Sequence, residues 1–270
     1  MMDGNEICEF QEKVFAFYRE NGRRFPWRGT VDRYAVMVSE TMLQQTQAER
    51  VAARFPEWMA RFPDIVSLAD ASLKDVLGCW SGLGYNSRGQ RLQRCARIVA
   101  DVHGGVVPGS PGELIRLPGI GAYTSRSIPI FADNLDIATV DTNIRRILIH
   151  QFSLPESITQ RALLDLAERL LPRGRSRDWH NALMDYGALV LTGKRTGVGP
   201  RTKQSAFKGS NRWYRGRIIR ALVGTDGLFL DEVEVAYGRR GLDMLARLEE
   251  EGLVERVEAS GREPFFRIPE

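Results

Sequence analysis

The sequence LPGIG, residues 117–121, separates two segments that have the apolar periodicity of α-helices. Its glycines, Gly119 and Gly121, allow a tight turn that exposes consecutive backbone N–H groups at the start of the second segment. Such a turn either binds one phosphate or only connects two packed helices. No strand precedes the glycines, as a dinucleotide-binding or P-loop fold requires, so a nucleic-acid backbone is favoured over a nucleotide cofactor.

Helical periodicity covers most of the chain on both sides of this turn. Before residue 192 strand signals are nearly absent, and helices are predicted at 6–20, 34–55, 73–80, 88–103, 113–117, 141–152, 159–171 and 179–191. A linker rich in Gly, Lys, Arg and Thr follows at 193–209. Beyond it the pattern predicts helices at 213–223, 231–237 and 242–250 and strands at 253–257 and 265–268. The chain is therefore expected to be all-α, with a small winged-helix-like C-terminal module.

Length and composition are those of a globular protein. The 270 residues include 43% hydrophobic and 27% charged residues, which fits two or three domains and excludes long disordered or fibrous classes. No apolar run approaches the roughly 18 residues of a membrane helix, and the N-terminal residues do not resemble a signal peptide. The three cysteines (Cys8, Cys79, Cys95) are widely spaced and cannot form a four-thiolate metal site. We therefore expect an intracellular protein without a membrane partner.

Positive charge is concentrated in one segment. Residues 186–220 contain nine basic and no acidic side chains, whereas 221–270 contain six basic and twelve acidic ones. A basic block of this kind is typical of a segment that faces phosphates, and equally of a solvated linker. Charge alone does not decide between these alternatives.

Two carboxylates are candidates for chemistry. Glu40 lies in an apolar helical stretch beside Val36, Met37 and Leu43, so partial burial is expected, and burial raises a carboxyl pKa toward the range of a general acid. The alternative is a glutamate that forms a salt bridge with an arginine. Asp141 stands where a helix begins, which makes it an N-cap. An N-cap aspartate is fixed in position and kept ionised, which also suits a group that stabilises a nearby cation.

Three further features suggest contact with DNA. Gln44, Gln45, Thr46 and Gln47 form a polar patch, expected to lie in the same helix as Glu40, that suits base edges or a solvated helix face. Tyr85 follows a glycine turn and is either a core aromatic residue or a wedge between base pairs. Arginines recur at every third position of the next predicted helix and are expected to form an at least partly solvated stripe: Arg88, Arg91, Arg94 and Arg97.

Taken together, these segments resemble the helix-hairpin-helix DNA glycosylases, and most closely the adenine glycosylases of the MutY type. The resemblance extends from about residue 25 to 191. The strings that carry it are FPWR (25–28), SETMLQQTQ (39–47), WSGLGY (80–85), LPGIG (117–121), VDTNIRR (140–146) and NALMDYG (181–187). The LQQTQ string is particular to the adenine branch, whereas the hairpin and the aspartate are shared by the superfamily.

The resemblance implies a two-lobed helical fold and a role for each site residue. Glu40 matches the general acid, Asp141 the residue that stabilises the glycosyl cation, and Tyr85 the intercalating wedge. Tyr123 and Asn143 match the base pocket, and Tyr123 replaces the catalytic Lys of the lyases, as in monofunctional glycosylases. The residues expected to bind DNA are Gln44, Gln45, Thr46, Gln47, Tyr85, Gly119, Gly121, Lys203, Lys208 and Arg212.

The sequence also departs from that family. Four cysteines usually ligate an iron-sulfur cluster after this region, but no cysteine follows Cys95, so no cofactor and no metal are expected. Residues 192–212 would then supply phosphate contacts through their basic side chains. Pro129 is expected to kink the helix after the hairpin. The Nudix-like C-terminal domain of the adenine enzymes has no counterpart in the acidic tail, so recognition of 8-oxoguanine by such a domain is not expected.

The sequence thus predicts a monofunctional DNA glycosylase of base excision repair. Its substrate would be a flipped, mispaired base, preferably adenine in an A/G or A/8-oxoguanine mismatch. The alternatives are a thymine or uracil glycosylase acting opposite guanine, and a non-catalytic mismatch-binding protein. We expect a monomer that binds double-stranded DNA with a mismatch or damaged base, located in the cytoplasm at the nucleoid.

The domain organisation can be predicted as well. A terminal-helix lobe would comprise residues 1–29 and 138–205, a second helical lobe with the hairpin residues 30–137, and the winged-helix-like module residues 206–270.

Overall fold

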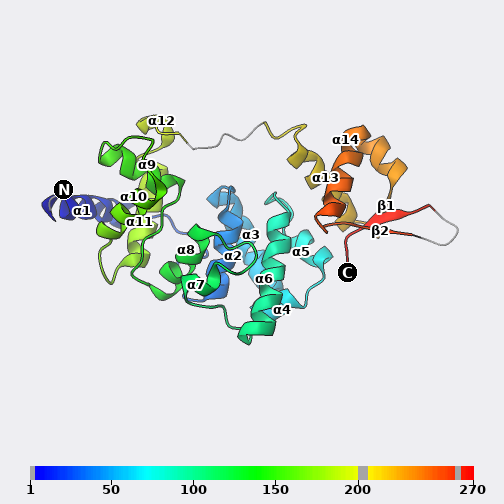
Figure 1. Ribbon diagram of the computed structural model, residues 1–270, viewed down its shortest axis with the longest axis horizontal. Coiled ribbons are helices and arrows are strands. Elements are labelled where there is room, and N and C mark those ends of the chain that lie inside the picture. Colours follow the sequence, from blue (N-terminus) through cyan, green and yellow to red (C-terminus); the bar gives the residue numbers. More distant parts are fainter. Residues whose placement is uncertain (1–3, 200–205, 259–262) are drawn as a thin grey trace. The chain divides into compact units, whose positions relative to one another are not determined.

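The computed structural model describes residues 4–199, 206–258 and 263–270, and it is mostly helical (Figure 1). The chain forms two compact units: residues 1–40, 108–116 and 120–203 make up the first, and residues 41–107, 117–119 and 204–270 the second. The C-terminal segment therefore packs in the same unit as residues 41–107. The division of the chain into three domains, with boundaries after residues 29, 137 and 205, stays a prediction. Within the described ranges, no helix has both the length and the apolarity to cross a bilayer.

The first unit is a helical bundle around aromatic residues. The Phe10 and Phe15 rings of the N-terminal helix lie 5.7 and 5.5 Å from the Trp179 ring, and all three side chains are buried. The helices of this unit are α1 (Gly4–Asn21), α2 (Arg33–Leu43), α7 (Pro111–Leu114), α8 (Ala122–Asp133), α9 (Thr142–Gln151), α10 (Gln160–Arg169), α11 (Ser176–Leu189) and α12 (Gly193–Thr196). The last residues of α2 belong to the second unit. Helix α8 continues through Pro129 and ends four residues later.

A buried ion pair attaches the segment after α1 to α11. The Asp185 carboxylate is fully buried and accepts hydrogen bonds from the Arg23 backbone N–H (2.8 Å) and from Arg28 Nη1 and Nη2 (2.6 and 2.9 Å). Burial alone would raise the pKa of Asp185, but the Arg28 and Arg23 hydrogen bonds and the Arg28 charge hold it below its ordinary value. The FPWR and NALMDYG strings therefore meet in one structural contact.

The second unit contains the remaining elements. They are α3 (Ala48–Arg61), α4 (Ile65–Ala69), α5 (Leu73–Cys79), α6 (Ser87–His103), α13 (Asn211–Val223), β1 (Leu228–Phe229), α14 (Leu230–Glu250), β2 (Glu255–Val257) and β3 (Phe265–Arg267). Helix α6 packs along α4 and α5, with Leu92, Cys95, Ala96 and Val99 buried. The Trp80 ring lies 5.4 Å from the Trp58 ring, and both side chains are fully buried.

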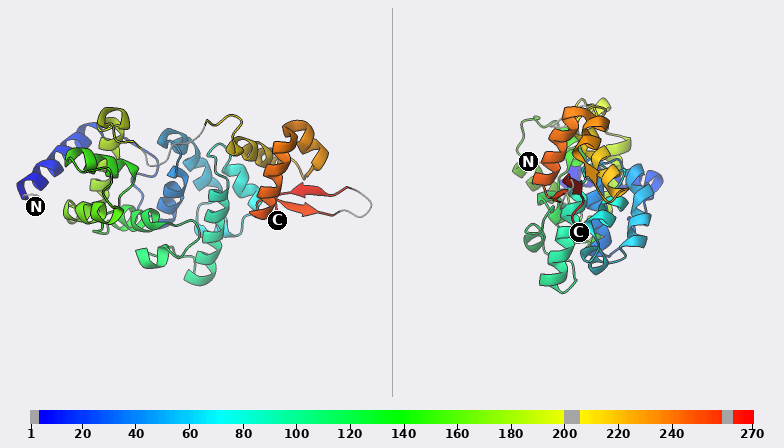
Figure 2. Two further views of the ribbon diagram at one scale, coloured as in Figure 1. Left: turned by 45° about the horizontal axis from the view of Figure 1, so that its top comes forward. Right: turned by 90° about the vertical axis from the view of Figure 1, so that its right-hand side faces the viewer.

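The C-terminal module has the predicted helices and wing. Helices α13 and α14 lie side by side (Figure 2). Strand β3 pairs in antiparallel fashion with both β2 and β1, which gives the strand order β1-β3-β2. Helix α14 bends at Gly238, whose φ of 64° and ψ of −170° separate the two predicted helices at 231–237 and 242–250. The short strand β1 has only two residues and was not predicted. The winged-helix-like prediction is confirmed, with one more strand.

The module shares its core with α5. Leu73 and Leu77 of α5 are buried in one cluster with Ile218, Leu222, Leu248 and Phe266 of the module. At the edge of this contact, Gln90 Nε2 donates a hydrogen bond to the Gly252 carbonyl oxygen at 2.6 Å. The C-terminal residues thus complete the hydrophobic core of the second unit.

The prediction of one helix over 34–55 was wrong. Helix α2 ends at Leu43, α3 begins at Ala48, and Gln44, Gln45, Thr46 and Gln47 form the turn between them rather than a helical patch. Gln45 has a φ of 59°, in the left-handed region that a helix interior excludes. Neither Gly nor Pro occurs between residues 43 and 48, so the apolar periodicity before and after the turn predicts a single helix.

The arginine stripe on α6 is partly solvated, as predicted: Arg91, Arg94 and Arg97 are exposed, whereas Arg88 is buried. Its Nη1 donates to the carbonyl oxygens of Thr41 and Met42 at 2.8 and 2.9 Å, at the end of α2. Its Nη2 donates to Thr46 Oγ1 and to the carbonyl oxygens of Leu83 and Gly84, each at 3.0 Å. One guanidinium therefore joins the end of α2, the turn after it and the glycine-rich loop. Burial lowers the pKa of Arg88 to about 10, so it stays charged at neutral pH.

We predict that Arg88→Met destabilises the protein by about 3 kcal/mol or more, because buried carbonyl groups lose a charged donor. The matched control is Arg94→Met on the same helix, where the side chain is exposed and the loss should stay within about 0.5 kcal/mol. Urea unfolding of both variants measures the difference. Equal losses would mean that Arg88 is an ordinary member of a surface stripe.

Candidate active site

Glu40 lies in the last two turns of α2, in the first unit, and its exposed fraction is 8%. The hydroxyl groups of Tyr123 and Ser127, one turn apart on α8, donate hydrogen bonds to its carboxylate. Burial raises the pKa of Glu40 to about 7, and the nearby Asp141 charge acts in the same direction, while the two hydrogen bonds oppose them. No ion pair of the described residues involves Glu40, so the salt-bridge alternative has no support in this part of the chain. The carboxyl group is poised to carry a proton near neutral pH.

Asp141 is the N-cap of α9, as predicted. Its backbone is extended, and Oδ1 accepts a hydrogen bond from the Ile144 N–H at 2.7 Å, while Oδ2 accepts one from Asn143 Nδ2 at 3.0 Å. Burial raises the pKa of Asp141, whereas these hydrogen bonds and the Arg146 charge lower it. Capping alone would have lowered the pKa, so the site is less polar than the sequence suggested. The carboxylate is nevertheless fixed in direction by two donors.

A chain of hydrogen bonds from Arg146 through Asn143 orients the groups that contact Asp141. Arg146 Nη2 donates to Asn143 Oδ1 at 2.8 Å and to the Gly187 carbonyl oxygen at 2.7 Å, and its Nε donates to the Leu191 carbonyl oxygen at 2.6 Å. Asn143 therefore has its amide turned toward Asp141 by Arg146. Sequence reasoning missed Arg146 and Ser127. The helical spacing would have indicated both, since Arg146 is three residues after Asn143 and Ser127 four after Tyr123.

The segment before Asp141 is held by a neutral histidine. His180 of α11 is buried, its Nε2 accepts a hydrogen bond from the Thr139 N–H at 3.2 Å, and its Nδ1 lies 2.7 Å from the Ser176 carbonyl oxygen. Because a carbonyl only accepts, Nδ1 carries the proton and Nε2 is free to accept. Burial lowers the pKa of His180 to about 4, which keeps this tautomer neutral at physiological pH.

The first unit therefore brings together four of the predicted site residues: Glu40, Asp141, Tyr123 and Asn143. Burial and both nearby carboxylates raise the pKa of Tyr123 well above its ordinary value, so its hydroxyl stays neutral and remains a donor. Two hydrogen bonds and the Arg146 charge favour the ionised form of Asp141, so a proton shared by the two acids is favoured on Glu40. One protonated acid and one ionised carboxylate are the groups required to expel a leaving group as a positive charge develops.

The candidate DNA-binding loops lie in the second unit. Thr46 Oγ1 donates to the Leu83 carbonyl oxygen at 3.2 Å and so joins the turn 44–47 to the glycine-rich loop. Tyr85 has a φ of 48°, and its hydroxyl accepts a hydrogen bond from Arg212 Nη1 at 2.8 Å. Tyr85 is only partly buried, so it is not a core aromatic residue.

The hairpin has the backbone that its glycines predicted. Gly119 has a φ of 81°, and an added Cβ would lie 3.1 Å from the Arg91 Cβ, so only glycine fits this turn without strain. Gly121 is the N-cap of α8 and offers no side-chain acceptor to the first N–H groups of that helix. Leu117 at the start of the turn and Ile120 between the two glycines are buried.

The basic segment is only partly described. Lys203 lies outside the described residues, whereas Lys208 is exposed just before α13 and Arg212 lies in its first turn. Arg215 of the same segment is paired with Glu251 through two hydrogen bonds of 2.7 and 2.5 Å. Some of the basic charge of this segment is therefore neutralised within the protein.

The chain is similar in sequence to known proteins. The model of the HhH-GPD superfamily of base excision DNA repair proteins matches residues 38–173. An adenine DNA glycosylase of Mycobacterium tuberculosis is 35% identical, with 77% of each chain covered. The human adenine DNA glycosylase is 38% identical over 72% of this chain and 38% of its own length.

Solved structures agree on the fold. A thermostable thymine-DNA glycosylase is similar with a TM-score of 0.68 and 28% identity, covering 71% of this chain and 90% of that one. Endonuclease III in a non-covalent DNA complex is similar with a TM-score of 0.64 and 14% identity, covering 74% and 91%. The family match includes Glu40, Tyr123, Asn143 and Asp141, and the chain belongs to the HhH-GPD superfamily of base excision DNA repair proteins.

Proposed function

We propose that this protein is a monofunctional adenine DNA glycosylase, which hydrolyses the N-glycosidic bond of a flipped adenine. The observation that carries the proposal is the buried Glu40, with a pKa raised to about 7, paired with an Asp141 that two hydrogen bonds fix at the start of α9. Relatives named adenine DNA glycosylase, 35% to 38% identical to this chain, support adenine as the base.

In the proposed reaction each carboxyl group carries one step. The Glu40 carboxyl transfers its proton to a ring nitrogen of adenine, and the C1′–N bond breaks with its electron pair going to the base. The Asp141 carboxylate stabilises the positive charge left on the sugar. Water then adds to C1′ and releases a proton, so the products are free adenine and an abasic site.

Tyr123 limits the reaction to hydrolysis. A lyase of this superfamily uses a lysine amine at the corresponding position to form a Schiff base, whereas Tyr123 offers a neutral hydroxyl. The DNA strand is therefore expected to stay intact after base release and to break only when alkali acts on the abasic site.

Thymine opposite guanine is the second candidate substrate, because a solved thymine-DNA glycosylase is 28% identical to this chain. A panel of duplexes separates the two. Each duplex has one mismatch (A/G, A/8-oxoguanine, A/C, T/G or U/G), and alkali cleavage after incubation locates the released base. Cleavage at adenine supports the proposal, whereas cleavage only at thymine or uracil would replace it. A protein that binds mismatches and releases no base would be non-catalytic.

The partner within this proposal is double-stranded DNA with a mismatched base, bound by a single copy of the chain. Relatives and structural neighbours that act on DNA support the partner class. In a bacterial cell such an enzyme would work at the nucleoid.

We predict that base release slows as the pH rises through about 7, because the neutral form of Glu40 is the acid and its pKa is raised to about 7. Glu40→Gln should lower the single-turnover rate by at least about 100-fold and Asp141→Asn by a similar factor, with duplex affinity within a few-fold. Single-turnover rates from pH 5 to 9 and fluorescence anisotropy provide the measurements.

Matched controls exist on exposed helix faces of the same unit. Glu12→Gln on α1 and Asp165→Asn on α10 remove the same charges from exposed positions and should leave rate and pH profile unchanged. Full activity of either site variant would remove the mechanism. A folded site variant that no longer binds DNA would reassign its carboxylate to a binding role.

We also propose that the protein works without the iron-sulfur cluster that the family resemblance implies. Three cysteines are too few for a four-thiolate cluster. Cys95 is buried in an apolar core, where burial raises the pKa of its thiol to about 12 and disfavours the thiolate form that a metal requires. Among the described residues, no group of three or more potential ligands could hold a metal ion.

The purified protein should therefore be colourless and contain less than about 0.1 iron per chain by atomic absorption. Base release should be unchanged after dialysis against a chelator, because no step uses a metal. A visible absorption band that disappears together with activity would contradict this proposal.

A further inference from the structure

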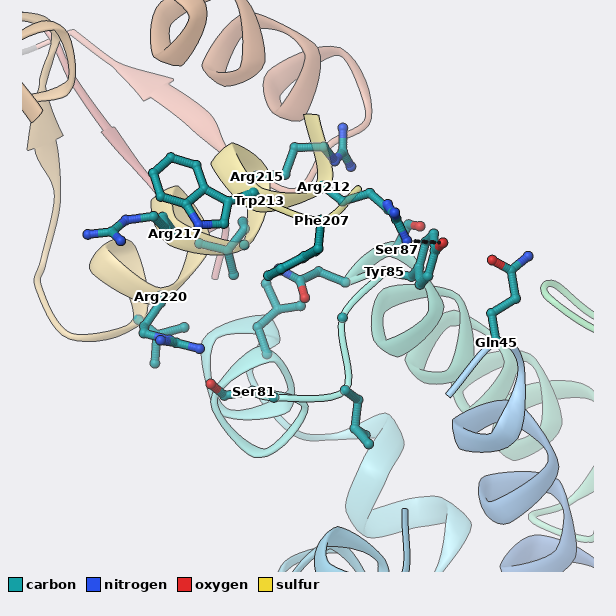
Figure 3. A pocket seen from close by; sticks show the side chains of 18 of the residues that line it. Gln45, Ser81, Tyr85, Ser87, Phe207, Arg212, Trp213, Arg215, Arg217 and Arg220 are labelled. Atoms are coloured by element: carbon teal, nitrogen blue, oxygen red, sulfur yellow. Dashed lines mark hydrogen bonds between the residues drawn. The ribbon is translucent and has the colours of Figure 1, made fainter. Parts of the chain in front are cut away.

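A large cavity lies in the second unit, between α13 and the loop 81–87. Its volume is about 830 Å³, and Figure 3 shows α13 and the loop on opposite sides of it, with Phe207 between them. Every residue that lines it belongs to the second unit, so the cavity is complete without the carboxylate site. Cavities of roughly 300 to 1,000 Å³ are typical of sites that enclose a small molecule, which is the size class of a nucleotide.

The charge of this cavity is strongly positive. Six arginines line it, and Glu251 is the one acid among its described lining residues: Arg50, Arg91, Arg212, Arg215, Arg217 and Arg220. Arg215 donates two hydrogen bonds to the Glu251 carboxylate and so holds the pKa of Glu251 below its ordinary value. Arg50, Arg217 and Arg220 form no ion pair with any carboxylate in the described part of the chain. The excess charge favours an anionic occupant.

Aromatic rings line the same cavity. The Phe207 side chain is 61% exposed, and Trp213 lies in the first turn of α13, 4.8 Å from its ring centroid to the Arg217 guanidinium. Exposed aromatic faces beside arginines are suited to stack a base while the phosphates on either side of that base are neutralised. A free phosphate ion would use the arginines only, so the combination favours a nucleic-acid strand.

The distribution of charge in the C-terminal module disfavours a duplex at this place. A helix-turn-helix protein reads duplex DNA with its second helix. In this module that helix belongs to α14, which has six acidic and three basic side chains, whereas α13 has four arginines and no acid. The bases of a duplex are also stacked on one another, so none is available to cover Phe207. An unpaired strand satisfies both the arginines and the ring.

We propose that this cavity binds single-stranded DNA, with the arginines of α13 on its phosphates and one base stacked on Phe207. The proposal goes beyond the proposed function, because neither carboxylate takes part and no base is released. An acidic peptide with aromatic side chains has related chemistry. Membership of a DNA repair superfamily favours the DNA strand over the peptide.

The test measures binding of the full chain to two single strands of equal length by fluorescence anisotropy at one fixed salt concentration. One strand is oligothymidylate, and the other consists of tetrahydrofuran units, which retain the phosphates and lack bases. Oligothymidylate should bind about tenfold tighter, because a stacked base adds to the affinity that the phosphates supply. Equal affinities would overturn the proposal. A peptide of alternating aspartate and phenylalanine that binds tighter than oligothymidylate would overturn it in favour of a protein partner.

Phe207 provides the variant that locates this preference. Phe207→Ala should make the affinities for the two strands equal, whereas Phe207→Trp, which retains a flat ring, should keep the difference. The matched control is Val235→Ala, an apolar side chain of α14 that is 89% exposed and does not line the cavity. A preference for oligothymidylate that survives in Phe207→Ala would overturn the proposal. An equal loss of affinity for a fully paired duplex would also overturn it, because a duplex has no base free to stack.

A second variant tests the phosphate contacts. Each phosphate of a single strand contributes about 0.7 to the slope of log affinity against log salt concentration, so Arg217→Gln combined with Arg220→Gln should flatten the slope by about 1.4. Arg239→Gln combined with Arg256→Gln removes the same charge from exposed positions outside the cavity and should leave the slope unchanged.

An unchanged slope in the folded α13 variant would overturn the phosphate contacts, and if that variant does not fold, the Phe207 series decides. The mismatch panel separates this proposal from the proposed function. A protein that releases adenine without any preference for oligothymidylate fails only here, whereas one that releases no base from any duplex fails the proposed function.

Discussion

The Arg88 guanidinium donates hydrogen bonds to four backbone carbonyl oxygens and one hydroxyl group, which belong to three segments of irregular or terminal backbone. Two acceptors are the last carbonyls of α2, which no helical N–H can reach. The others belong to the turn at Thr46 and to the loop at Leu83 and Gly84. Because this loop and this turn are short and irregular, their conformation depends on a donor from outside. A lysine could not replace Arg88, since one ammonium group cannot reach acceptors that spread over a planar fork.

In the first unit the corresponding constraint is the burial of two acids in one site. Two nearby carboxylates cannot both ionise without large cost, and the surroundings decide which one keeps the proton. Asp141 receives a backbone N–H and the Asn143 amide, and Arg146 adds positive charge behind it. The Glu40 carboxyl group accepts hydrogen bonds from two hydroxyl groups only, and its side chain is more deeply buried than that of Asp141. Its neutral form is therefore favoured. The difference between the acids thus arises from their donors and not from their own chemistry.

Much of this arrangement could be predicted from sequence, because local patterns encode it. Apolar periodicity predicted the helices of both units, Glu40 was expected to be buried because its helical neighbours are apolar, and Asp141 was expected to cap α9. What sequence could not predict depends on tertiary contacts. Arg88 follows the same three-residue spacing as the exposed Arg94, so only the structure distinguishes a buried clamp from a surface side chain. The break after Leu43 was missed for a related reason, since hydrogen bonds from Arg88 stabilise it without glycine or proline.

The shared core of α5 and the C-terminal module bears on how such a protein arises by recombination of genes. A module that is connected to the rest of the protein by a linker alone can be exchanged or lost as a unit. In this protein Leu73 and Leu77 of α5 are instead covered by Leu222 and Leu248 of the C-terminal module. Transplanting the first 200 residues alone would leave this apolar face in water. Inheritance of α5 and the C-terminal module is therefore coupled, and changes on one side of the core select for changes on the other.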